Sequence, residues 1–134
     1  MYTVIRFSGF REPAESQQFG LGLNAIVPGL YTGPDRVVGR ISCTVSSEDA
    51  WPAHGLAIEK LLSSLQTVIR EAIHSGLRVE LDVAVEPEDY QNRLLTETIL
   101  MEADLLKLIA SLRLDLAVTV YGTRRGAEEV SGTD

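Results

Sequence analysis

The stretch HGLAIEKLLSSLQTVIREAIHS, residues 54–75, decides the fold. Its large apolar side chains recur at steps of three and four residues, so that on a helix they form one stripe. Polar side chains fill the opposite side, and Gly76 offers the left-handed residue that often ends a helix. We therefore expect a long amphipathic helix with one buried face. The stripe consists of Ile58, Leu61, Leu62, Leu65, Val68, Ile69, Ala72 and Ile73.

Alternating segments around this helix predict the strands of a sheet. The clearest is Leu77 to Glu86, where apolar and charged residues alternate as on a strand with one buried and one solvated face. A short leucine-rich helix at about residues 105–112 precedes the last expected strand. The other expected strands are residues 2–8, 36–46 and 114–121.

Two segments are ambiguous. Residues 94–101, LLTETILM, fit a strand, which uses both threonines well, or the beginning of the second helix. We predict the strand, because a helix would place Thr98 and Glu102 within its apolar face. Glycines and prolines recur through residues 9–35, so we expect a loop there with at most a short strand at residues 23–27.

From residue 36 onward the expected elements follow the order β-α-β-β-α-β, which is that of ferredoxin-like folds. The predicted fold is therefore α+β: an antiparallel sheet with two helices on one face. The N-terminal strand would be an extra strand at one edge. A chain of 134 residues is typical of one domain. We expect that domain to span residues 1–121 and a flexible tail to follow at residues 122–134.

The final third of the chain, LLKLIASLRLDLAVTVYG at residues 105–122, resembles the end of a bacterial family of small α+β domains of unknown function. Members of that family end in a short leucine-rich helix, an alternating strand and a tyrosine, here Tyr121. They also carry a tryptophan before the central helix, here Trp51. The resemblance covers residues 45–121, while the glycine-rich residues 20–34 depart from the family pattern. It implies a small bacterial α+β domain and no particular activity.

Composition and charge argue against several classes of partner. The net charge of −7 disfavours nucleic acid and anionic membrane surfaces. The single cysteine, Cys43, excludes an intrachain disulfide and stands in a strand pattern that suits a buried residue. The sequence shows neither a secretion signal nor an apolar run long enough to span a membrane. We therefore expect a cytoplasmic protein.

No motif in the sequence predicts a catalytic, cofactor-binding or metal-binding residue. The string Gly20-x-Gly22-x-x-Ala25 resembles a dinucleotide fingerprint but lacks the strand before it and the helix after it. The two histidines, His54 and His74, stand at opposite ends of one expected helix, about 30 Å apart at 1.5 Å per residue, too far to share a metal. We expect His54 to be packed or capping and His74 to be solvated.

The sequence leaves two functions open. The first is a non-enzymatic protein-interaction module that binds itself, as a homodimer, or a basic protein, as an immunity or accessory protein would. The second is a small-molecule binder or enzyme with a site between residues 20–34 and the sheet. Glu80 and Asp82, about 7 Å apart on one strand face, could suit acid/base chemistry or a hard cation, whereas a solvated sheet face explains them more simply. The candidate ligand or interface residues are Tyr31, Arg36, Arg40, Glu80, Asp82 and Tyr121.

Overall fold

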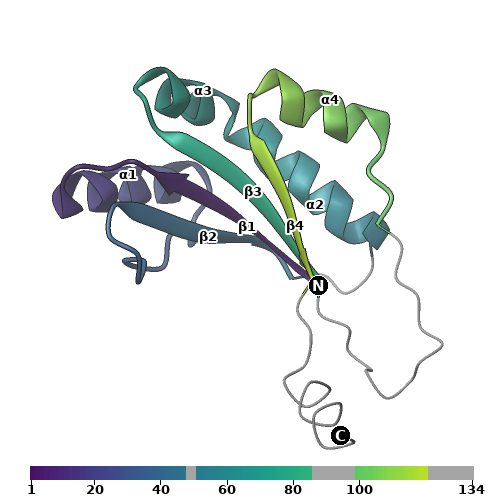
Figure 1. The fold of residues 1–134 in the computed structure, drawn as a ribbon, viewed down its shortest axis with the longest axis horizontal. Coiled ribbons are helices and arrows are strands. Elements are labelled where there is room, and N and C mark those ends of the chain that lie inside the picture. Colours follow the sequence, from purple (N-terminus) through teal and green to yellow (C-terminus); the bar gives the residue numbers. More distant parts are fainter. Residues whose placement is uncertain (48–50, 86–98, 121–134) are drawn as a thin grey trace, which may run out of the picture.

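The structure is a computed structural model that describes residues 1–47, 51–85 and 99–120. These residues form an α+β fold in which a sheet is covered by helices (Figure 1). The strands are β1 (Tyr2–Ser8), β2 (Arg40–Ser46), β3 (Arg78–Val85) and β4 (Asp115–Val120). The helices are α1 (Pro13–Ile26), α2 (Trp51–Ser64), α3 (Gln66–His74) and α4 (Ala103–Ser111).

The described strands form a mixed sheet in the order β2-β1-β3-β4. β1 pairs antiparallel with both β2 and β3, whereas β3 and β4 are parallel. The prediction of a wholly antiparallel sheet with β1 at an edge is therefore wrong. β1 is central, and its core-side residues Thr3, Ile5 and Phe7 are fully buried.

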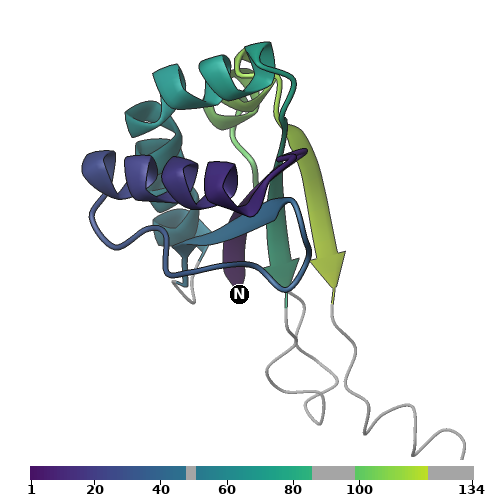
Figure 2. The ribbon, with the colours of Figure 1, turned by 90° about the vertical axis from the view of Figure 1, so that its left-hand side faces the viewer.

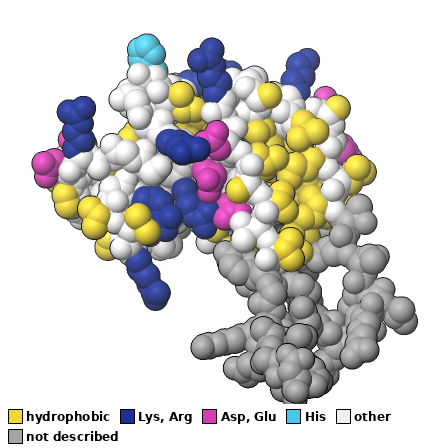
Figure 3. All heavy atoms as spheres, in the orientation of Figure 1, with side chains coloured by type: hydrophobic (Ala, Val, Ile, Leu, Met, Phe, Trp, Pro, Cys, Tyr) yellow, Lys and Arg dark blue, Asp and Glu magenta, His cyan; other side chains and the backbone are white. Residues whose placement is uncertain are grey.

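The four helices cover one face of the sheet (Figure 2), where two were predicted. The core lies between these layers and combines the apolar sides of β1, β2 and β3 with the stripe of α2 and α3. Ile58, Leu62 and Ile69 from that stripe are fully buried, as the sequence predicts. The other face of the sheet is open and carries the polar side chains of the strands (Figure 3).

The helix α1 corrects the expectation that residues 9–35 are loop with a short strand at 23–27. Pro13 occupies its first turn, where a missing N–H costs little. Leu23 is fully buried in the core, and the ring of Phe19 lies 4.8 Å from that of Phe7, centroid to centroid. Tertiary packing thus stabilises a helix whose two internal glycines give it a low intrinsic propensity.

The central helix is present but divided. Leu65 separates α2 from α3 with φ −98° and ψ 6°. Hydrogen bonds still run through it, because its N–H donates to Leu61 O and its carbonyl accepts from Ile69 N–H. The predicted end at Gly76 is confirmed, with φ +99°. The N–H of Gly76 donates to Ile73 O, and that of Leu77 donates to Ala72 O, closing the helix.

The predicted ferredoxin-like order is not confirmed by the described strands, which lie in the sheet in the order β2-β1-β3-β4. Within residues 94–101, positions 99–101 contain no strand, and 94–98 lie outside the described residues. Strand β2 begins at Arg40 rather than at residue 36. The segments predicted at 77–86 and 114–121 form β3 and β4 with boundaries shifted by at most one residue. The predicted tail, residues 122–134, lies outside the described residues. Among the described residues, no helix is long and apolar enough to cross a membrane.

Candidate interaction surface

The carboxylate pair predicted on β3 belongs to an ion-pair network on the open sheet face. Arg6 of β1 donates through Nη1 to Glu80 Oε1 at 3.1 Å and to Asp82 Oδ2 at 2.7 Å. Thr119 of β4 donates to Asp82 Oδ1 at 2.8 Å. Asp82 therefore links three adjacent strands. A carboxylate held in this way is a structural tie, since its charge is neutralised and its oxygens are occupied.

A second ion pair fixes the segment before β2. Arg40 donates from Nε to Asp35 Oδ2 at 2.9 Å and from Nη2 to Asp35 Oδ1 at 3.1 Å, while Ser42 Oγ donates to Asp35 Oδ2 at 2.5 Å. The Asp35 side chain is only 7% exposed. Arg40 is thereby engaged, whereas Arg36 is exposed and has no ion-pair partner among the described residues.

We predict that the stability supplied by Asp35 is lost in acid. The hydrogen bond from Arg40, aided by Ser42 and by the N–H of Val37, holds the pKa of the Asp35 carboxyl far below its usual value of 3.8, against the opposing effect of burial. A folded pKa below the unfolded one stabilises fully above about pH 4, and the stabilisation declines as the pH falls below that value. Replacing Asp35 by asparagine should cost about 1–3 kcal/mol at pH 7.

Urea denaturation of the wild type and of Asp35→Asn between pH 2 and 7 measures this effect. The two unfolding free energies should converge as the pH falls from 4 toward 2. If the difference between the two unfolding free energies stays constant over this pH range, the ionised carboxylate of Asp35 contributes nothing to stability.

The two arginine networks border a shallow hollow of about 700 Å³ on the open face. It lies between β1, β2 and residues 32–36, which is close to the ligand site predicted from the sequence. Arg6, Arg36 and Arg40 line it, but Tyr31 and the carboxylates of Glu80 and Asp82 do not. The sixth candidate, Tyr121, lies outside the described residues. The structure thus brings four of the six candidate residues, Arg36, Arg40, Glu80 and Asp82, onto one face. It does not assemble a site from all six.

Tyr31 has a different position, against α1. Its N–H donates to Asn24 Oδ1 at 2.7 Å, and its carbonyl accepts from Asn24 Nδ2 at 3.0 Å. The ring covers Gly20, where an added Cβ would lie 2.5 Å from ring atoms. Gly20 and Gly22 are therefore interior residues of a helix and do not form a phosphate-binding turn.

A feature that the sequence reading missed is the outer edge of β4. Its register with β3 places Leu116, Val118 and Val120 on the helix-covered side, beside Leu81, Val83 and Val85. Yet these three side chains are 39%, 52% and 66% exposed. Within the described sheet β4 is an edge strand, so its outer backbone groups have no strand partner there. Its only charged residue is Asp115, at its first position.

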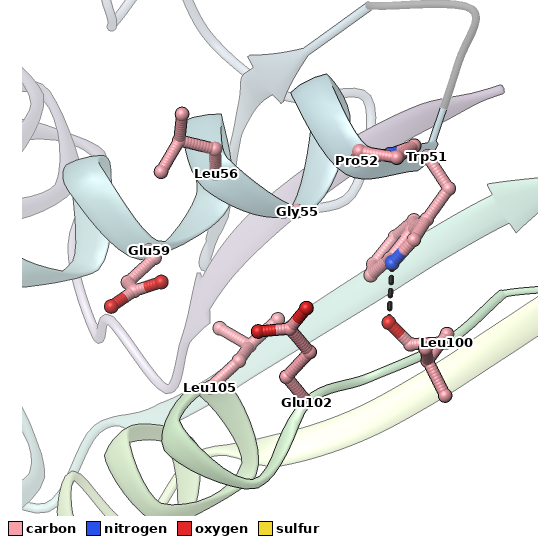
Figure 4. A pocket seen from close by; sticks show the side chains of 8 residues that line it. All are labelled: Trp51, Pro52, Gly55, Leu56, Glu59, Leu100, Glu102 and Leu105. Carbon is pink, nitrogen blue, oxygen red and sulfur yellow. Dashed lines mark hydrogen bonds between the residues drawn. The ribbon is translucent and has the colours of Figure 1, made fainter.

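The helix layer extends past this edge, so that the beginning of α2 lies beyond β4 (Figure 1). Apolar side chains gather on this side of the molecule (Figure 3). There a groove of about 400 Å³ lies between the first turns of α2 and the segment that leads into α4. The groove is lined by Trp51, Pro52, Gly55, Leu56, Glu59, Leu100, Glu102 and Leu105 (Figure 4).

Trp51 organises this groove. Its indole N–H donates to the carbonyl of Leu100, which ties α2 to the segment before α4 (Figure 4). The ring lies against Gly55, where a Cβ would approach it to 3.1 Å. Leu56 and Leu100 are 67% and 64% exposed. Trp51 was predicted as a family feature, but no pattern in the sequence indicates that the segment near Leu100 would lie beside it.

Two glutamates give this apolar groove a negative charge. Glu59 is half-buried on α2, and Glu102 is exposed at the beginning of α4. Neither has an ion-pair partner among the described residues, and no lysine or arginine lines the groove. Such a surface suits an apolar partner that carries positive charge.

The histidines and the cysteine occupy structural positions. His54 is fully buried and its Nε2 shares a hydrogen bond with the hydroxyl of Thr3, which confirms that it is packed. His74 ends α3. Cys43 is buried, and burial raises the pKa of its thiol to about 11. Among the described residues, no group of three His, Cys, Asp or Glu side chains could hold a metal ion.

Comparison with known proteins finds no matching family model, no matching curated protein and no matching solved structure. The resemblance of residues 45–121 to a bacterial domain family therefore stays a prediction.

Proposed function

We propose that the protein is a non-enzymatic interaction module that binds a partner protein along the outer edge of β4. The observation that carries this proposal is the row formed by Leu116, Val118 and Val120, which faces the helix side of the sheet and is nevertheless exposed. A strand added at this edge would extend the sheet and cover that row. Strand addition of this kind gives affinity through backbone hydrogen bonds and specificity through alternate side chains.

The two edges of the described sheet differ in a way that supports this choice. Beside β2, residues 35–37 are held by the bonds of Asp35 to Arg40, Ser42 and the N–H of Val37. Proteins usually protect an exposed edge strand with lysine, proline or a bulge. The pairing of β2 with β1 has a register irregularity at Thr3/Val4, whereas β4 pairs with β3 in continuous register and contains no lysine and no proline.

The alternative of a small-molecule site in the open-face hollow has weaker support. Arg40 is occupied by Asp35, and Nη1 of Arg6 is occupied by Glu80 and Asp82. Of the three arginines that line the hollow, only Arg36 has no ion-pair partner among the described residues. The β4 edge, by contrast, combines open backbone groups with apolar surface.

The proposal predicts a protein-sized adduct on the wild-type chain that Val118→Lys removes. A lysine on the edge strand places a charge within the apolar row and opposes strand addition. The measurement is a native mass spectrum of each protein purified gently from its own host. The adduct can be another protein or a second copy, since either would use the edge.

Ser63→Lys is the matched control, because it adds the same charge at an exposed position of α2 away from β4. This variant should retain the adduct. A bare wild-type monomer, or an adduct that survives Val118→Lys unchanged, would refute the proposal.

A further inference from the structure

We infer that the partner is a basic protein that lays an extended segment along β4 and inserts a lysine or arginine side chain into the Trp51 groove. This inference rests on the proposed function and specifies its partner. It follows from three features of the groove: its position beyond the β4 edge, its apolar floor and its unpaired carboxylates.

The position of the groove matches the reach of an added strand. A new strand would lie about 4.8 Å outside β4, on the side where the helix layer continues to α2 (Figure 1). Alternate side chains of that strand would point toward the helices. They would meet the exposed surfaces of Leu56 and Leu100 and the ring of Trp51.

The charge of the groove selects the partner. Glu59 and Glu102 have no described cation beside them, and the chain as a whole carries −7. A lysine or arginine has an apolar stem that can contact Leu56 and Leu100, and a cationic end that can reach both glutamates. Its charge can also interact with the face of Trp51.

A second copy of this chain fits the groove less well. The strand that it would add is β4, whose sequence DLAVTV contains no lysine or arginine. Two copies would also bring two net charges of −7 together. Homodimerisation, which the sequence left open, would therefore leave both groove glutamates without a counterion.

Trp51 is the only tryptophan of the chain, so that its fluorescence reports on the groove alone. The probe is a blocked pentapeptide of alternating valine and arginine, titrated into the full chain. A reference peptide replaces each arginine by citrulline, which keeps the shape and removes the charge. We expect saturable change in Trp51 fluorescence with the arginine peptide, and binding about tenfold weaker with the citrulline peptide.

The double variant Glu59→Gln/Glu102→Gln should weaken binding of the arginine peptide about 10- to 25-fold, at about three- to fivefold per glutamate. Glu71→Gln, on the exposed side of α3, is the matched control and should leave it unchanged. Raising the salt concentration should weaken binding of the arginine peptide.

Equal affinity for both peptides, or no effect of the double variant, would overturn the inference of a basic partner. A native mass spectrum that shows a homodimer abolished by Val118→Lys would overturn it too, while leaving the β4 edge as the interaction surface. A different result would refute the proposed function itself, namely an adduct that Val118→Lys does not affect.

Discussion

Replacing Asp82 by alanine should lower the free energy of unfolding by about 2–3 kcal/mol. The Asp82 side chain is 8% exposed and accepts hydrogen bonds from Arg6 of β1 and Thr119 of β4. Its removal takes a partner from a partly buried guanidinium and from a hydroxyl at the same time. The loss should appear as a lower midpoint in urea denaturation with an unchanged slope.

Glu80→Ala is the matched control for this prediction. Glu80 contacts the same atom, Arg6 Nη1, but its side chain is 36% exposed and its contact is longer, at 3.1 Å. Solvent screens such a pair, so its loss should cost less than about 1 kcal/mol. If Asp82→Ala and Glu80→Ala lower the free energy of unfolding equally, the greater burial of Asp82 does not strengthen its contribution to stability.

The second large effect is expected within α1, where two alanine substitutions should change stability in opposite directions. Gly20→Ala should destabilise the protein by about 1–3 kcal/mol, because its methyl group would overlap the Tyr31 ring. The ring cannot easily move away, since both backbone polar groups of Tyr31 bond to Asn24. Gly22→Ala should stabilise by about 0.5–1 kcal/mol, because an added Cβ would have no atom within 4 Å other than its chain neighbours and the backbone of its own helix.

Thermal or urea denaturation of Gly20→Ala, Tyr31→Ala and the double variant shows whether overlap with the Tyr31 ring causes the loss of stability in Gly20→Ala. If the clash with the ring is the cause, Gly20→Ala should be neutral or stabilising once Tyr31 is alanine. A loss from Gly20→Ala that persists in the Tyr31→Ala background would contradict this explanation.

Sequence periodicity predicted the elements whose pattern is local. The apolar stripe of residues 54–75 corresponds to α2 and α3, and the alternation of Leu77 to Glu86 corresponds to β3. Helix α1 was missed because its stability comes from contacts distant in sequence, such as Phe19 with Phe7. The strand order was missed because alternation shows which side of a strand is apolar but not which strand lies beside it.

The candidate site was predictable only in part. The carboxylates of Glu80 and Asp82 were identified, but their neutralisation by Arg6 depends on the pairing of β1 with β3. The strand that carries Leu116, Val118 and Val120 was predicted from its alternation, and this row lies on the helix side of the sheet. Its exposure could not be predicted, because it arises from the edge position of β4 and the limited cover that α4 provides.

Amide hydrogen exchange along β4, with and without the valine–arginine peptide, tests most directly the claim that this edge accepts a strand. We expect slower exchange within residues 116–120 when the peptide is present, because outward N–H groups gain hydrogen-bond acceptors. Amides of β2, at the opposite edge, should be unaffected. Unchanged exchange in β4 with the peptide bound, or protection of β2 instead, would contradict the account.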